Sequence, residues 1–190
     1  LKTTRVLIER GGGMALSTQD VQAWSVIWPG AAGPSNMVMP SLLFNNATIM
    51  PNRDFGVETP LVDEIKECND MVSSVFQRIN DRGDMLRVAS SVPGADGKRV
   101  IGTVITAVRA DGKPDPVVTT VLGGQTYRGL NPALGEMYLT AYEPLKDASG
   151  AIIGMVGVGW KMDTANSLIK SIMGIKVGKR SEEHTSELQS

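Results

Sequence analysis

Residues 136–161, EMYLTAYEPLKDASGAIIGMVGVGWK, carry the strongest local structural signal in the chain. Two extended runs, 137–145 and 151–160, flank the polar segment 147–150, which ends in glycine, the residue that tolerates a positive φ. Short polar segments of this kind join antiparallel strands. The stretch therefore predicts a β-hairpin.

The two strands of this hairpin are expected to differ in character. Because strand side chains alternate between faces, Tyr138, Thr140 and Tyr142 share one face, which then carries two aromatic rings with hydroxyl tips. The second strand is almost entirely apolar, with glycines interleaved, and such glycines often mark bulges or the close approach of another backbone. We therefore expect the second strand to be central, with both of its faces covered.

Composition limits the class of protein. The chain has 190 residues, of which 42% are hydrophobic and 21% charged, so it can bury one substantial core. Its formal net charge of -1 gives no basic stripe for nucleic acid. Its single cysteine, Cys68, excludes an intrachain disulfide framework and a multi-cysteine zinc site. No apolar run reaches the roughly 18 residues that would span a membrane. We expect sequence to be missing at both ends, because the chain begins with Leu1 and ends in the adapter-like segment described next.

Residues 180–190, RSEEHTSELQS, resemble the translation of a sequencing-library adapter, and we interpret them as an artefact rather than protein. This segment contains His184, which is the one histidine of the chain. Without it, a catalytic triad based on histidine, haem ligation through histidine and a zinc site with histidine all lose their basis. We therefore expect no metal site and no cofactor.

The remaining sequence predicts a leading helix, an extended pair, and a helix followed by a meander. Thr59 is expected to cap the first complete helix, with Pro60 at its first position, and Cys68 near its end is expected to be packed and inert. A second short helix should begin after Asp115 as its cap. The expected helices are 1–10, 60–69, 116–122 and 163–173, and the expected strands before the hairpin are 21–28, 36–39, 72–79, 85–92, 99–108 and 125–130.

Several blocks of the sequence resemble the successive blocks of extracytoplasmic Cache sensor domains of bacterial receptors, and most closely the type in which a first Cache unit is followed by a second. The resemblance covers roughly residues 40–173. One departure is that Leu130-Asn131-Pro132 follows Tyr127-Arg128-Gly129, where family members often continue with another arginine and a bulky residue. The blocks are PNRDFGVETPLVDEI, VFQRINDRGDMLRVASSV, DGKRVIGTVI, PDPVVTTVLGGQTYRG and YLTAYEPLKDASGAIIGMVGVGWK.

The resemblance implies an α+β fold, a PAS-like antiparallel sheet of about five to six strands with a leading helix and flanking helices. It implies a sensor domain over residues 1–162, followed by an exit helix and the truncated start of a second unit over 163–179. Such a domain binds a small molecule, such as an organic acid or amino acid, outside the cytoplasmic membrane, and signals through its helices to a chemotaxis or sensor-kinase output. We expect no enzymatic activity, membrane contact through helices outside this fragment, and a possible homodimer.

The candidate ligand-binding residues are arginines and tyrosines of the predicted sheet. An inward-facing guanidinium needs a carboxylate from the protein or from a ligand, because burying it unpaired costs several kcal/mol. Tyrosines supply flat apolar walls with hydroxyl donors. The alternative for each arginine is an exposed position on the sheet, and Arg99 and Arg109, which adjoin turns, are expected to be solvated. The candidates are Arg78, Arg87, Tyr127, Arg128, Tyr138 and Tyr142.

Functions of other classes find less support in the sequence. An enzyme needs a nucleophile with a base, clustered carboxylates or metal ligands, and the chain offers no convincing set. A cofactor-binding PAS domain needs a haem ligand or a flavin-reactive cysteine, whereas Cys68 falls in an early helix. A ligand-free structural or dimerisation module of a membrane receptor remains the alternative.

Overall fold

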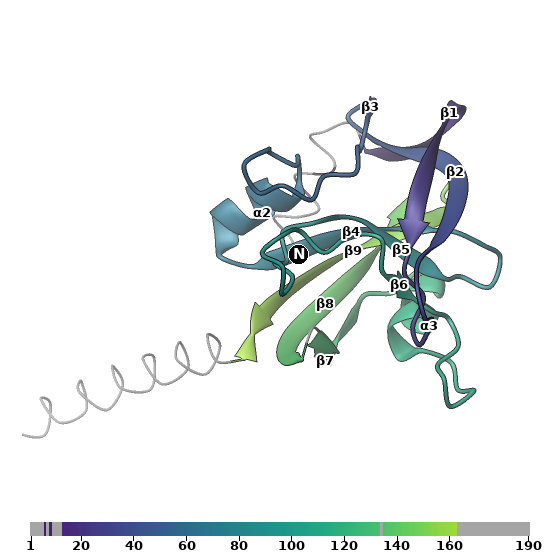
Figure 1. Ribbon diagram of the computed structural model, residues 1–190. Coiled ribbons are helices and arrows are strands. Elements are labelled where there is room, and N and C mark those ends of the chain that lie inside the picture. Colours follow the sequence, from purple (N-terminus) through teal and green to yellow (C-terminus); the bar gives the residue numbers. More distant parts are fainter. Residues whose placement is uncertain (1–5, 7, 9–12, 134, 163–190) are drawn as a thin grey trace, which may run out of the picture.

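The structure is a computed structural model that describes residues 6, 8, 13–133 and 135–162 (Figure 1). Within these residues the chain forms a three-stranded sheet, a six-stranded sheet and two helices, α2 and α3. The elements are β1 (Met14–Val26), β2 (Ser35–Phe44), β3 (Ala47–Thr48), α2 (Val62–Asn69), β4 (Val72–Arg78), β5 (Met85–Ser90), β6 (Val104–Ile105), α3 (Pro116–Leu122), β7 (Tyr127–Ala133), β8 (Glu136–Lys146) and β9 (Ile152–Lys161).

The six-stranded sheet has the strand order β6-β5-β4-β9-β8-β7, and all of its paired strands are antiparallel. The hairpins β4–β5 and β8–β9 meet where β4 pairs with β9, so strands far apart in sequence lie side by side at the centre. This arrangement is a PAS-like α+β fold, which confirms the predicted fold class. The β1–β2 ribbon also forms where extended structure was predicted, with Trp24 opposite Met37.

The hairpin of residues 136–161 has the predicted form. Its turn is held by the Asp147 carboxylate, which accepts hydrogen bonds from the amides of Ser149 at 2.8 Å and Ala151 at 3.0 Å, and Gly150 has a φ of 87°. Every residue of β9 from Ile153 to Gly159 is buried, and the strand lies between β4 and β8. The prediction of a central strand covered on both sides is therefore confirmed.

The two faces of this sheet carry different layers, which we name the α2 face and the α3 face. On the α2 face, sheet residues such as Val75 and Val156 pack with Val62 and Ile65 of α2 and with Trp24 of β1. A smaller apolar cluster lies on the α3 face, where α3 contacts the sheet (Figure 1). This cluster consists of Phe76, Met85, Val117, Val118, Val121 and Met155. It covers part of the α3 face and borders the site described below.

The predicted strand 99–108 is wrong over most of its length, because only Val104–Ile105 pair with β5. The chain before β6 instead bridges between β5 and the β1 ribbon. Gly102 donates its amide to the Arg87 carbonyl at 2.8 Å, and the Ile27 amide donates to the Gly102 carbonyl at 2.7 Å. Gly102 has a φ of 80°, and a Cβ there would lie 2.6 Å from the Ser25 carbonyl oxygen. Contacts with the β1 ribbon thus replace regular strand pairing over most of residues 99–108.

The predicted start of α2 is also wrong by two residues. The helix begins at Val62, and Leu61 occupies the cap position with a φ of 69° and no side-chain cap. Thr59 does not cap the helix through its side chain. Its backbone amide donates instead to the Asp63 carboxylate at 2.7 Å. Cys68 is exposed rather than packed, because the buried positions of this short helix lie in its first half. By contrast, Asp115 caps α3 as predicted, accepting from the amides of Val117 and Val118.

Arg99 is buried, with 1% of its surface exposed, which contradicts the expected solvation. Its guanidinium binds the Asp63 carboxylate through two hydrogen bonds of 2.6 and 2.8 Å. It also donates to the carbonyls of Asp54, Val57 and Ser90, and its Cζ lies 4.4 Å from the centroid of the Phe55 ring. Partners from three segments satisfy this cation, so it joins α2 to β5 and to the loop before α2.

Three sequence-based expectations fall largely or wholly outside the described residues. Of the leading helix, only Val6 and Ile8 are described, and both are helical. The exit helix with the start of a second unit, 163–179, and the adapter-like segment, 180–190, lie beyond the described residues. Within the part of the chain that the structure describes, no helix is long and apolar enough to cross a membrane.

Candidate ligand-binding site

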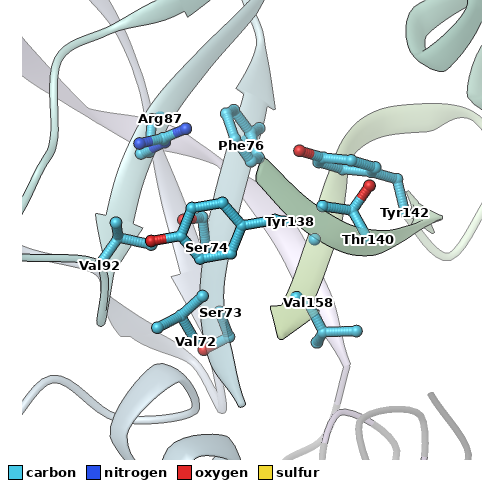
Figure 2. A pocket seen from close by; sticks show the side chains of 12 residues that line it. Val72, Ser73, Ser74, Phe76, Arg87, Val92, Tyr138, Thr140, Tyr142 and Val158 are labelled. Atoms are coloured by element: carbon cyan, nitrogen blue, oxygen red, sulfur yellow. The ribbon is translucent and has the colours of Figure 1, made fainter. Parts of the chain in front are cut away.

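A small cavity lies on the α3 face, over the junction of β4, β9 and β8 (Figure 2). Its volume is about 40 Å³, and most of its wall is apolar. Aromatic rings from β4 and β8 form its sides, and the glycines of β9 form its floor. The lining residues are Val72, Ser73, Ser74, Phe76, Arg87, Val92, Tyr138, Thr140, Tyr142, Gly157, Val158 and Gly159.

The cavity exists because glycines stand opposite the aromatic side of β8. Tyr142 pairs with Gly157, and Thr140 pairs with Gly159. A Cβ on Gly157 would lie 2.5 Å from Cε1 of Tyr142, so the Tyr142 ring occupies the space that a side chain would take. The predicted alternation of β8 is confirmed, since Tyr138 and Thr140 are buried on this face.

Arg87 is the cation of this cavity, and it has no counter-charge among the described residues. It lies on β5 opposite Phe76, next to a register shift between β4 and β5, and its Cζ is 5.1 Å from the centroid of the Phe76 ring. Its Nε is buried without a hydrogen-bond partner, and no ion pair or side-chain hydrogen bond joins Arg87 to the rest of the described chain. Burial lowers the pKa of its guanidinium, whereas the phenol groups of Tyr142 and Tyr138 act to raise this pKa.

Tyr142 stands at the centre of an aromatic group. Its ring centroid lies 6.1 Å from that of Phe76 and 6.3 Å from that of Tyr127, and the ring planes are tilted by 58° and 56°. Burial raises the pKa of the Tyr142 phenol, and Arg87 opposes this rise. The phenol is therefore a protonated donor at neutral pH. Figure 2 shows the Tyr142 hydroxyl on the same side of the sheet as Arg87.

A wider cleft of about 560 Å³ adjoins the cavity and shares Arg87 and Tyr142 with it. The cleft extends toward α3 and β7, where Tyr127, Asn131 and Asp115 line it. The Asn131 amide donates to the Thr140 hydroxyl at 2.6 Å, and this hydroxyl donates to the Gly129 carbonyl at 3.0 Å. Arg87 and Tyr142 therefore form the wall between an inner cavity and an outer cleft.

The structure brings four of the six predicted site residues together. Arg87, Tyr138 and Tyr142 line the inner cavity, and Tyr127 lines the outer cleft. Arg78 and Arg128 line neither of them. The Arg78 guanidinium donates to the carbonyls of Asn80 and Asp81, both at 3.0 Å, and so closes the β4–β5 turn. Arg128 is exposed on the strand position after Tyr127, which directs it to the opposite face of the sheet.

Several lining residues of the cavity were not predicted from the sequence. Phe76 could have been found from the hairpin register, since it lies opposite Arg87. Gly157 and Gly159 were noticed as strand glycines, but their role as the cavity floor depends on the pairing of β9 with β8. Ser74 and Val92 carry no distinctive sequence signal. Across the described residues, no three histidine, cysteine, aspartate or glutamate side chains gather as metal ligands.

The six-stranded sheet therefore carries a small cavity on its α3 face, and the lining of this cavity includes one arginine, Arg87. The family model of the Cache 3/Cache 2 fusion domain matches residues 19–180, and the chain belongs to this family. Cache domains are extracytoplasmic sensor modules of receptors, so the resemblance predicted from the sequence is confirmed. A comparison with curated proteins found no significant match.

Proposed function

We propose that this chain is the periplasmic input domain of a bacterial transmembrane receptor for chemotaxis or two-component signalling. It binds a small organic acid or amino acid at the inner cavity and has no enzymatic activity. The observation that carries the proposal is the Arg87 guanidinium, which faces the cavity without an anionic partner among the described residues. Tyr138, Tyr142 and Tyr127 are proposed to contact the ligand with Arg87.

A carboxylate ligand removes the energetic problem that Arg87 presents. Arg87 is partly exposed, but its Nε is buried without a partner, and a bidentate carboxylate supplies two charge-assisted hydrogen bonds. Arg99 is a structural arginine of the same fold, and its guanidinium donates hydrogen bonds to the Asp63 carboxylate and to three backbone carbonyls. The Arg87 guanidinium has no such partner among the described residues, as expected of a residue that binds a ligand.

The position of the cavity suggests how occupancy reaches the membrane. The Tyr142 ring of β8 packs against Gly157 of β9, so a ligand that moves this ring also shifts the contacts of the central strand. Strand β9 ends at Lys161, directly before the segment 163–173 that the sequence predicts as the exit helix. We propose that this connection transmits the signal to helices outside this chain, within a receptor that acts as a homodimer.

A thermal-shift screen of the purified chain against organic acids, amino acids and amines tests the sensing function. A ligand at a hundredfold excess over its Kd should stabilise the fold by roughly 2.7 kcal/mol. Arg87→Met should abolish this stabilisation. Arg128→Met is the matched control, because it removes the same charge from the opposite face of the sheet, and it should retain the full response.

The alternative is a ligand-free structural or dimerisation module. The small inner volume of about 40 Å³ favours it, since pockets for drug-sized ligands hold roughly 300 Å³ or more. No response across the whole library, together with a concentration-dependent dimer in analytical ultracentrifugation, would support this alternative and contradict the proposed sensing function.

A further inference from the structure

The charges around the cavity restrict the kind of ligand that it can hold. Arg87 is the only charged side chain among the described residues that line the inner cavity. One enclosed cation neutralises one negative charge, and a second carboxylate would be buried without a partner, at high energetic cost. The site therefore favours a monoanion over a dicarboxylate.

The same lining offers no free carboxylate for an ammonium group. Asp115 is the only acidic side chain among the described residues that line the cavity or the cleft. One of its oxygens accepts from the amides of Val117 and Val118 at 2.9 and 3.1 Å, and the other accepts from Arg109 Nε at 3.0 Å. Both oxygens are thus engaged in capping α3 and in an ion pair, so the ammonium of an amino acid would find no free carboxylate in this lining.

The size and polarity of the cavity fix the remaining part of the ligand. A volume of about 40 Å³ corresponds to roughly three water-sized groups. Apart from Arg87 and the aromatic rings, the cavity is bordered by Val72, Val92 and Val158 and by the glycine floor. The hydroxyls of Ser73, Ser74 and Thr140 also line it, and each is engaged in a hydrogen bond within the protein. A short alkyl chain of the ligand can pack against this wall, whereas a second polar group of the ligand would lose its hydration there.

On the basis of the proposed sensing function, we propose that the ligand is a short aliphatic monocarboxylate of about two to four carbon atoms that lacks an amino group. Its carboxylate binds the Arg87 guanidinium and accepts from the Tyr142 or Tyr138 hydroxyl, and its alkyl group lies over Gly159 and beside Val72 and Val92. Neither of these tyrosine hydroxyls has a hydrogen bond to another described residue, so both are available as donors.

Isothermal titration calorimetry of the purified chain at constant ionic strength tests this ligand class. The probes are acetate, propionate and butyrate, compared with propionamide, ethylamine, L-alanine and succinate. Propionamide keeps the shape of propionate without its charge, and L-alanine adds an ammonium to it. We expect at least one monocarboxylate to bind and each comparison compound to bind about tenfold more weakly or not at all.

Variants connect the binding to the cavity. Arg87→Met should weaken monocarboxylate binding by about thirtyfold or more, while Arg128→Met should leave it unchanged. Gly159→Ala adds a methyl to the floor, 3.3 Å from Cγ2 of Thr140, and should weaken butyrate more than acetate. Circular dichroism and melting curves establish that each variant is folded.

The outcomes separate this inference from the sensing function. Binding of L-alanine, succinate or propionamide as tight as that of propionate overturns the assignment of the ligand class but leaves a sensing domain. Monocarboxylate binding that survives Arg87→Met places the ligand elsewhere and also overturns the inference. The sensing function itself fails only if neither these probes nor the wider library bind.

Discussion

The Arg87 guanidinium lies above the ring of Phe76, with Cζ 5.1 Å from the ring centroid and with its Nε buried and unpartnered. Arg99 also lies above an aromatic ring, that of Phe55, at 4.4 Å, but it makes two hydrogen bonds to Asp63. Each cation thus lies over its own phenylalanine ring, but only Arg99 has a carboxylate partner among the described residues. This difference predicts opposite effects of the same substitution.

Replacing Arg87 with methionine should not destabilise the ligand-free protein. The substitution removes an enclosed charge without a partner and retains an unbranched apolar side chain beside Phe76. We expect the free energy of unfolding to stay the same or to rise by about 1 kcal/mol in urea denaturation. A loss of more than about 2 kcal/mol would mean that Arg87 has a structural partner and would argue against its role as a ligand contact.

Replacing Arg99 with methionine should destabilise the protein by about 3 kcal/mol or more, measured in the same urea experiment. The substitution leaves the Asp63 carboxylate and three carbonyls without their shared donor. Asp63→Asn should lower the free energy of unfolding by less, because the side-chain oxygen of the asparagine can still accept from the Thr59 backbone amide. If the double variant costs as much as the sum of the single ones, the two side chains are not coupled.

Replacing Gly157 with alanine should destabilise the protein by about 1–3 kcal/mol through overpacking. The added methyl would meet the Tyr142 ring, which must then move away from the floor of the cavity. Gly33→Ala is the matched control, because its Cβ meets nothing within 4 Å and its φ needs no glycine. Melting curves should show a lower midpoint for the first variant and an unchanged or higher midpoint for the control.

The Tyr142 phenol should ionise at a higher pH than an exposed tyrosine. Burial favours its neutral form, so this contribution to stability is fully present below the unfolded pKa of about 10 and is lost as the pH rises through the higher folded pKa. Tyrosinate absorbance, compared between the parent protein and Tyr142→Phe, reports the titration. Arg87→Met should raise the Tyr142 pKa further, since the cation that opposes the rise is gone. An unchanged titration in Arg87→Met would indicate that the two groups do not interact.

Local patterns were sufficient for several parts of the fold. The alternation of β8 and the turn from Asp147 to Gly150 predicted the central hairpin, and Asp115 before Pro116 predicted α3. Both could be predicted because strand alternation and helix capping depend on residues close in sequence. The start of α2 was predicted less well. There Asp63 binds Arg99, which is 36 residues away, and a local capping pattern does not contain this contact.

In the candidate site too, some residues could be assigned from the sequence and others could not. Tyr138 and Tyr142 could be assigned to one face from parity alone, and both line the cavity. The arginines could not be separated in this way. Arg78 closes its own turn, Arg87 enters the cavity, and Arg128 is exposed on the opposite face. Each lies in or at the end of a strand, and their different surroundings depend on the β4–β5 register shift and on which elements cover each face.

The hairpin of residues 136–161, the α+β class and the family could be inferred from the sequence, because they follow from alternation, turn chemistry and ordered blocks of residues. Three features emerge only from the folded chain: β9 pairs with β4, glycines form the floor beneath Tyr142, and Arg87 lacks the partner that Arg99 has. Whether a buried charge is satisfied depends on groups brought together from distant parts of the chain. A local sequence pattern does not contain that information.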